Sequence, residues 1–279
     1  MSSPVVNPNG TLKGKVAVVT GASRGIGEAI CARLAMEDAR VVASARTAES
    51  GESRLPGTLH DTVDRLRRAG AEAAFIKADL AVAADRERLI DETAALFGPV
   101  DILINNAAIT YFMPVTDFTE KRFKLMMEVQ VYAPFHLSQL VLPSMIERGS
   151  GSIVNISSPA GIHPKPPYRG GRGGTVYGMC KAALERFTTG LASEVQANGI
   201  AVNVVSPGLV DTPGVAVHGL INEQSKDRVQ PIEYIAEAVY QLAKADPATM
   251  TGRVDYAEPL LKELGLEPSA LIWALWRCA

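Results

Sequence analysis

Short apolar runs rich in β-branched residues recur along the chain and alternate with longer stretches of helical periodicity. Several runs are continuously apolar, as is typical of strands buried on both faces of a sheet. The predicted strands are Val16–Thr20, Val41–Ser44, Ala74–Ala78, Ile102–Asn105, Ile153–Ile156, Ile200–Ser206 and a weaker Arg253–Ala257, and the predicted helices cover 25–37, 58–69, 84–97, 119–147, 175–197 and 231–244. This alternation predicts an α/β fold: a doubly wound parallel sheet of about seven strands, flanked by helices on both faces.

Three segments interrupt the alternation. Thr47–Gly57 is predicted to be a long polar loop, and Pro159–Gly174, which holds four prolines and five glycines, a second loop. The tail Pro268–Ala279 carries Trp273 and Trp276, which we expect to pack on the chain's own core. We place no domain boundary at these segments, because 279 residues suit one large α/β domain.

Composition narrows the classes of partner. Hydrophobic residues make up 47% of the chain, which is ample for a core, and the formal net charge is −2. A near-neutral balance argues against a nucleic-acid partner, which would require a basic surface. No apolar run reaches the roughly 18 residues of a membrane helix, and residues 1–12 hold no apolar signal core. Scattered cysteines predict a cytoplasmic protein with reduced thiols, and widely separated histidines predict no metal site.

A glycine-rich turn, Thr20-Gly-Ala-Ser-Arg-Gly-Ile-Gly27, follows the first predicted strand and leads into a helix. Gly21 allows a tight turn, and Gly25 and Gly27 let backbone and helix approach a pyrophosphate, whose charge suits a helix N-terminus. The spacing differs from the usual G-x-G-x-x-G, and an ordinary strand-to-helix turn is the alternative. The turn follows the first strand of a chain in which strands and helices alternate, and this position favours dinucleotide binding. The expected contacts are Gly21, Ser23, Arg24, Gly25, Ile26 and Gly27.

This turn and several later motifs together resemble the short-chain dehydrogenase/reductase family over roughly residues 12 to 255. In order, the later motifs are Asp79 after the third strand, Asn105-Asn-Ala-Ala108, Ser158 after the fifth strand, Tyr177-x-x-x-Lys181 and Pro207-Gly-Leu-Val-Asp-Thr212. The resemblance implies one Rossmann-like domain over residues 1–279, with a core at 12–255 and a C-terminal extension at 256–279. It also implies cofactor contacts at Asp79, Leu80, Asn106, Val210 and Thr212.

The end of the second predicted strand bears on the choice of nicotinamide cofactor. The strand runs Arg40-Val-Val-Ala-Ser-Ala-Arg46 and has no acid at its end. An acid would hold the ribose 2′-hydroxyl, whereas an arginine suits a 2′-phosphate. Arg46 is placed to pair with that phosphate, with Arg24 as a second partner; the alternative is that both are solvated surface charges. We therefore expect NADP(H) as the preferred cofactor, with NAD(H) as the other candidate.

Tyr177 and Lys181 lie four residues apart, which puts them on the same face of a helix. A free tyrosine has a pKa of about 10, so proton transfer near neutrality requires a drop of roughly three pH units. A neighbouring ammonium and a positively charged nicotinamide both favour the phenolate. We expect Tyr177 to act as general acid or base on a carbonyl or alcohol oxygen, and Ser158 to donate a hydrogen bond to that oxygen. By resemblance, Tyr177 and Lys181 also contact the cofactor, Lys181 through the nicotinamide ribose.

Two residues depart from the family pattern. Gln130 stands where the family often has an asparagine that supports a water-linked proton relay to the lysine. The amide is one methylene longer, so the relay is kept, altered or absent. Ala108 stands where the family usually has glycine, and it should be tolerated if its φ is negative.

The resemblance implies an oxidoreductase acting on a small carbonyl or alcohol substrate, which we expect to be apolar. The loop Pro159–Gly174 should line or cover the substrate site. Its cations Lys165, Arg169 and Arg172 would then meet an anionic group or merely keep the loop solvated. Two other readings stay open: a silent NADP-binding regulator or scaffold of the same fold, and a reductase of an enoyl or imine bond. The long helices at 119–147 and 175–197 resemble the family's dimer surface, so we expect a homodimer or homotetramer.

Overall fold

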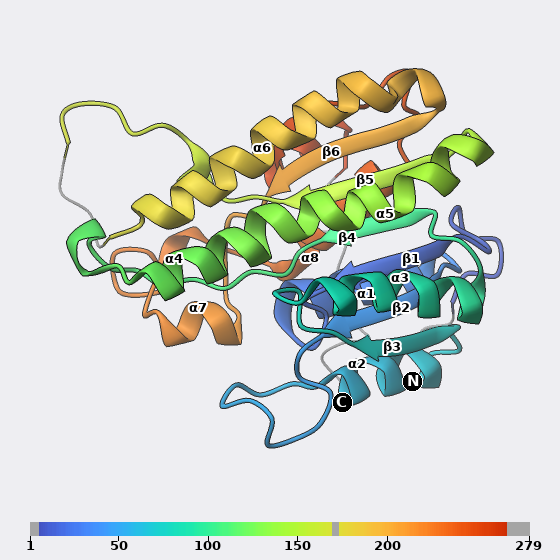
Figure 1. Cartoon of the computed structure of the whole chain (residues 1–279), viewed down its shortest axis with the longest axis horizontal. Helices are drawn as coiled ribbons and strands as arrows, with labels where there is room; N and C mark the ends of the chain where they lie inside the picture. The colour runs from blue at the N-terminus through green and yellow to red at the C-terminus, as the bar shows by residue number, and fades with distance from the viewer. Residues whose placement is uncertain (1–5, 169–172, 267–279) are drawn as a thin grey trace.

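The computed structural model describes residues 6–168 and 173–266 of the chain. Seven parallel strands form one sheet in the order β3-β2-β1-β4-β5-β6-β9 (Figure 1). The strands are β1 Val16–Thr20, β2 Arg40–Ala45, β3 Ala73–Lys77, β4 Ile102–Asn105, β5 Gly151–Ile156, β6 Ile200–Ser206 and β9 Val254–Tyr256. Each predicted strand is confirmed to within two residues. The predicted fold class, a Rossmann-like doubly wound sheet, is therefore confirmed.

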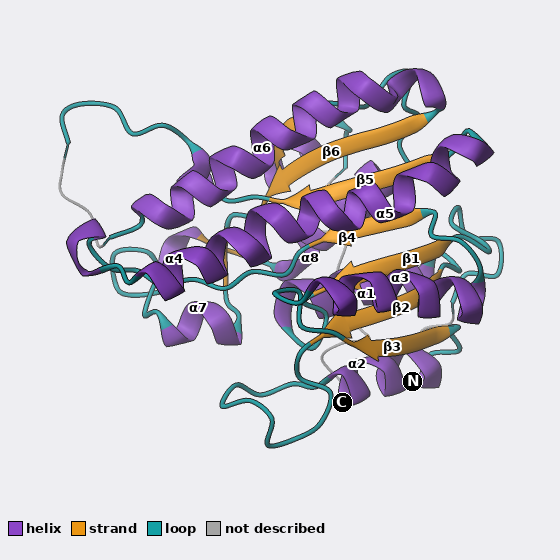
Figure 2. Ribbon diagram, in the orientation of Figure 1, coloured by secondary structure: helices purple, strands orange, loops and turns teal. Residues whose placement is uncertain are grey.

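Helices cover both faces of the sheet (Figure 2). One layer contains α1 (Gly25–Met36), α2 (Leu59–Arg68), α8 (Ile232–Ala243) and α9 (Ala257–Glu263), and the other contains α3 (Ala83–Phe97), α5 (Ala133–Arg148) and α6 (Thr175–Val195). Adjacent residues of β1 illustrate why two layers are needed, since Val18 faces one core cluster and Val19 the other. On α1, Ile30 and Leu34 are fully buried, as their spacing predicts.

The stretch 119–147, predicted to be one helix, is interrupted. It consists of α4 (Glu120–Met127), a π-helical turn over Glu128–Tyr132, and α5. Pro134 lies in the first turn of α5 and has no N–H to donate to the carbonyl four residues earlier. The prediction of an uninterrupted helix was wrong because this missing donor favours a wider turn at that point.

The carboxyl ends of all seven strands meet at one edge of the sheet, on the left in Figure 2. A small second sheet of β7 (Leu209–Val210) and β8 (Val229–Gln230), and the short helix α7 (Pro213–Val217), lie in the region beyond this edge. None of these short elements was predicted. In doubly wound sheets, ligands bind to the loops at this edge, so we expect the functional site there.

Beyond the last strand, α9 packs Ala257, Leu260 and Leu261 into the core. The tail with Trp273 and Trp276 lies outside the described residues, so its expected packing stays a prediction. Within the described part of the chain, no helix combines the length and apolar character required to cross a bilayer.

Candidate active site

The glycine turn between β1 and α1 is built so tightly that it excludes side chains. Gly25 has a φ of +58°, which favours glycine. A Cβ atom at Gly27 would lie 2.3 Å from the Gly21 carbonyl oxygen and 2.6 Å from Asn106 Nδ2. The first residues of α1 can therefore pack directly against the turn, and the free backbone N–H groups at the start of the helix remain available to a ligand.

Thr20, the last residue of β1, locks this turn to the end of β4. Its hydroxyl donates to the Ile104 carbonyl at 3.1 Å and accepts the N–H groups of Asn106 at 3.0 Å and Ala107 at 3.1 Å. Asn106 in turn donates through Nδ2 to the Thr20 carbonyl at 2.8 Å. This role of Thr20 has no local signal in the sequence, because its partners lie more than 80 residues away.

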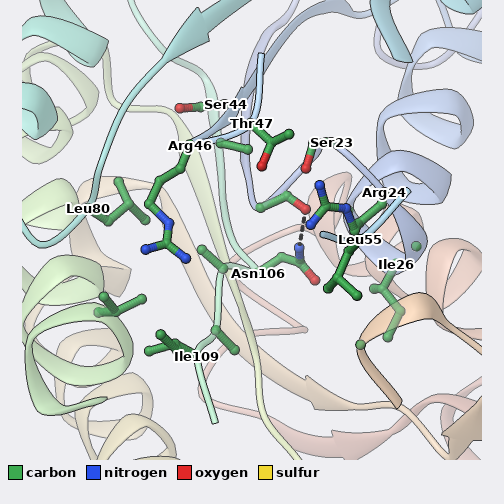
Figure 3. Close-up of a pocket in the computed structure, with 18 of the residues that line it drawn as sticks. Ser23, Arg24, Ile26, Ser44, Arg46, Thr47, Leu55, Leu80, Asn106 and Ile109 are labelled. Carbon is green, nitrogen blue, oxygen red and sulfur yellow. Dashed lines mark hydrogen bonds between the residues drawn. The ribbon is translucent and has the colours of Figure 1, made fainter. Parts of the chain in front are cut away.

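A cleft of about 300 Å³ opens in front of the turn (Figure 3). It is lined by most of the residues predicted to bind a dinucleotide: Gly21, Ser23, Arg24, Gly25, Ile26, Gly27, Arg46, Asp79, Leu80, Asn106 and Thr212. Val210, predicted with them, is instead buried in β7 and does not belong to this lining. At its other end the cleft reaches Ala108 and Ile109, and Ile109 packs in the same apolar cluster as Tyr177.

Two guanidinium groups approach this cleft from opposite sides in Figure 3. Arg24 donates from Nη2 to the Gly57 carbonyl at 2.8 Å and from Nη1 to Ser53 Oγ at 3.4 Å. Burial, and then the positive charge of Arg46, lower the pKa of the Arg24 guanidinium. Two neighbouring cations that repel each other form a site that an anion such as a phosphate would stabilise. This end of the cleft therefore carries two positive charges that could meet an anionic group of a ligand.

Ser158, Tyr177 and Lys181 come together where β5 ends beside α6. The Ser158 hydroxyl accepts the Ala160 N–H at 3.2 Å and hydrogen-bonds with the Tyr177 side chain. The Lys181 Nζ donates to the Ile156 carbonyl at 2.9 Å and lies 5.6 Å from the centre of the Tyr177 ring. The three residues predicted to be catalytic are thus one cluster, although 23 residues separate the first from the last.

Burial dominates the acid–base properties of this cluster. It raises the pKa of Tyr177, and the hydrogen bond with Ser158 offsets only part of that increase. Burial likewise lowers the pKa of Lys181 from its ordinary 10.5 to about 8. The expected drop in the Tyr177 pKa is therefore not seen, because desolvation of the buried phenol outweighs the effect of the neighbouring ammonium.

The two departures from the family pattern have different outcomes. Ala108 has no positive φ, since Asp38 is the one non-glycine residue with a positive φ in the described part of the chain, so its backbone is unstrained. Gln130 lies in the π-helical turn and is almost fully buried. Its Nε2 donates to the Ile109 carbonyl at 2.8 Å, and among the described residues its Oε1 has no partner. The amide therefore supports the backbone beside the cleft and keeps one acceptor free.

Comparison with known proteins now identifies the family. A family profile described as short chain dehydrogenase matches residues 15–219. The chain belongs to the short-chain dehydrogenase/reductase family. It is 33% identical over 246 residues to the 3-oxoacyl-(acyl-carrier-protein) reductase FabG of Escherichia coli, covering 86% of this chain and 94% of FabG. It is also 33% identical over 234 residues to ketoacyl reductase HetN of a Nostoc species, covering 84% and 77% of the two chains.

Solved structures show the same relationship. A metagenomic short-chain oxidoreductase in complex with NADP has a TM-score of 0.70 and 29% identity, covering 88% of this chain and 97% of its own. A 3-oxoacyl (acyl-carrier-protein) reductase from Agrobacterium tumefaciens with NADP bound has a TM-score of 0.76 and 27% identity, covering 88% and 93%. The protein is therefore an oxidoreductase of the short-chain dehydrogenase/reductase family.

Aromatic side chains form a wall beside Tyr177 in this short-chain dehydrogenase/reductase. The Phe112 ring centre lies 5.7 Å from that of Tyr177 and 5.0 Å from that of His218, with both pairs close to perpendicular. The Met113 N–H donates to the Gly173 carbonyl at 3.0 Å. The described end of the loop Pro159–Gly174 is thus tied to the segment beside Tyr177.

The three cations of the loop Pro159–Gly174 do not line this wall together among the described residues. Arg169 and Arg172 lie outside the described residues, and Lys165 lines a separate groove along α6. Their expected contact with an anionic group therefore stays a prediction.

Proposed function

We propose that this short-chain dehydrogenase/reductase is an NADP(H)-dependent enzyme that interconverts a carbonyl group and an alcohol. The observation that carries the proposal is the cluster of Ser158, Tyr177 and Lys181 beside the cleft that ends at Ala108 and Ile109. When bound, the nicotinamide would supply or accept the hydride at the substrate carbon. The chain's own residues would transfer the proton to or from the substrate oxygen and stabilise the negative charge that develops on it.

In reduction, Tyr177 donates its phenolic proton to the carbonyl oxygen as hydride reaches the carbon. Its raised pKa means that the proton is in place over the physiological pH range. Ser158 accepts the Ala160 N–H and hydrogen-bonds with Tyr177, so its hydroxyl proton would turn from the phenol to the developing oxyanion on a bound substrate. Lys181, held by the Ile156 carbonyl, places a positive charge beside the ring that becomes phenolate. In oxidation the same groups act in reverse.

The preference for NADP(H) is supported by the arginine pair. Among the described residues, Arg46 lines the cleft without a hydrogen-bonding or acidic partner, so its guanidinium is available to a 2′-phosphate. The last residues of β2 offer no carboxylate that would favour NAD(H). The two solved relatives above hold NADP, which agrees with this choice.

The test is consumption of NADPH with a panel of ketones, aldehydes and 3-oxoacyl thioesters, the last because two relatives are named for ketoacyl reduction. Wild type should turn over part of the panel, and Tyr177→Phe should lose at least about a hundredfold in kcat, because it lacks the transferable proton. Tight NADPH binding without turnover of any carbonyl would instead favour the regulator. Product analysis separates carbonyl reduction from reduction of an enoyl or imine bond.

We also propose that the protein assembles with further copies of itself through α5 and α6. Tyr132, Phe135 and Ile146 expose 47, 43 and 43% of their surface there, and the ring of Phe135 lies 6.0 Å from that of Phe187 on α6. Apolar side chains this exposed on adjacent helices are stabilised by association. Light scattering should report a dimer or tetramer for wild type and a smaller species for Phe135→Asp; identical masses would contradict the proposal.

A further inference from the structure

The turn that carries Ser158 is attached to α6 at several points. It consists of Ser157 and the 3₁₀ turn Pro159–Gly161, with Ser158 between them. A Cβ atom at Gly178, next to Tyr177 in the sequence, would lie 2.6 Å from the Ala160 carbonyl oxygen, so turn and helix are in direct contact. The distance from Ser158 to Tyr177 therefore depends on how this turn sits on the helix.

One carboxylate bonds one end of the turn and lies close to the other. The Ser157 hydroxyl donates to Glu185 Oε1 at 2.6 Å, and Ser157 is 97% buried. At the other end, a Cβ atom at Gly161 would lie 2.7 Å from the same Oε1 atom, so the glycine leaves room for the carboxylate where it lies. Because Ser157 is bonded to this oxygen and directly precedes Ser158, loss of the Glu185 carboxylate would release the start of the turn.

We propose that Glu185 is a positioning residue for catalysis, in that its carboxylate clamps the turn to α6 through Ser157, beside Gly161, and so sets the distance between Ser158 and Tyr177. This inference rests on the proposed function for its effect on rate, but the clamp itself is a structural claim. A short, charge-assisted hydrogen bond from a buried hydroxyl has the strength and direction that such a role requires. Glu185 lies outside the dinucleotide cleft, so its role should be separable from cofactor binding.

Three variants test the clamp. Glu185→Ala removes the acceptor, Glu185→Gln keeps an oxygen that can accept the same hydrogen bond, and Glu194→Ala removes an exposed glutamate from the same helix as a matched control. We expect Glu185→Ala to lower kcat about tenfold while the KM for NADPH stays within about twofold, because a displaced Ser158 weakens the contact with the reacting oxygen and leaves the dinucleotide cleft in place. Glu185→Gln should stay within about threefold of wild type in kcat, and Glu194→Ala should match wild type.

Hydrogen exchange of the peptide covering residues 157–162 provides a readout that does not need turnover. We expect exchange about fivefold faster in Glu185→Ala than in Glu194→Ala, and wild-type exchange in Glu185→Gln. If exchange in Glu185→Ala equals the control, or if it rises while kcat is unchanged, the inference is overturned. If wild type reduces no carbonyl, the proposed function fails, and exchange still decides whether Glu185 holds the turn.

Discussion

Replacing Arg46 with alanine should weaken the use of NADPH about tenfold and leave the use of NADH nearly unchanged. In the described part of the structure the Arg46 guanidinium has no partner, whereas Arg24 already donates to Gly57 and Ser53. A hydrogen bond to a charged group contributes about 1.5–3 kcal/mol. Arg46 is exposed, so screening by solvent favours the lower end, and about 1.5 kcal/mol corresponds to roughly a tenfold change in kcat/KM.

The assay is the kcat/KM for NADPH and for NADH at saturating carbonyl substrate, at low and at high ionic strength. The matched control is Arg40→Ala, which removes an equal charge at the opposite end of β2, where Arg40 pairs with Glu72 at 2.9 Å. The Arg46 effect should shrink at high salt, as expected for an exposed charge. Equal losses with NADPH and NADH, or an equal loss in Arg40→Ala, would refute the assignment of Arg46 to the 2′-phosphate.

Three more predictions concern Gly27 in the glycine turn, the buried Lys181, and Gly173, whose carbonyl accepts the Met113 N–H. Gly27→Ala would put a Cβ 2.3 Å from the Gly21 carbonyl oxygen. Fluorescence titration should therefore show loss of NADPH binding, and thermal unfolding should show a loss of about 1–3 kcal/mol in the free energy of unfolding. Binding of NADPH as tight as in wild type would contradict this expectation. The pKa of Lys181 is about 8 in the folded protein and 10.5 when unfolded, so the unfolded chain binds more protons between these pH values. The free energy of unfolding should therefore rise between pH 8 and 10.5 by about 3 kcal/mol more in wild type than in Lys181→Met. Parallel pH profiles of the two proteins would contradict this expectation. Gly173→Ala would put a Cβ 2.1 Å from the Met113 carbonyl carbon, so KM for the carbonyl substrate should rise several-fold while the Kd for NADPH holds; a rise in both would point to general unfolding.

The strands of the sheet could be predicted because burial on both faces leaves a continuous apolar run, as in Ile200–Ser206, where every residue is buried. The two-residue strands β7 and β8 could not, since a pair such as Leu209–Val210 is too short to show a period. Pro134 was the one residue near the break that indicated an interruption of the helix predicted at 119–147. The apolar periodicity of the neighbouring residues nevertheless favoured the prediction of a continuous helix.

The candidate site was predictable wherever a local motif fixes a residue, as with Gly27 and with the four-residue spacing of Tyr177 and Lys181. The protonation behaviour was not predictable, because spacing places a lysine beside a tyrosine without revealing how far both are desolvated. The contact between Ser157 and Glu185 was likewise hidden, since 28 residues separate the two and neither belongs to a motif.

The most direct test of the central claim is transfer of deuterium from NADPH carrying deuterium at both hydrogen positions of the nicotinamide C4 to a carbonyl substrate, followed by mass spectrometry of the product. The account predicts an alcohol one mass unit heavier, with deuterium on the former carbonyl carbon, for wild type. It also predicts at least about a hundredfold less labelled product per unit time for Tyr177→Phe at equal cofactor occupancy. Unlabelled alcohol, deuterium at another carbon, or equal rates in the two proteins would contradict the assignment of hydride and proton transfer to this site.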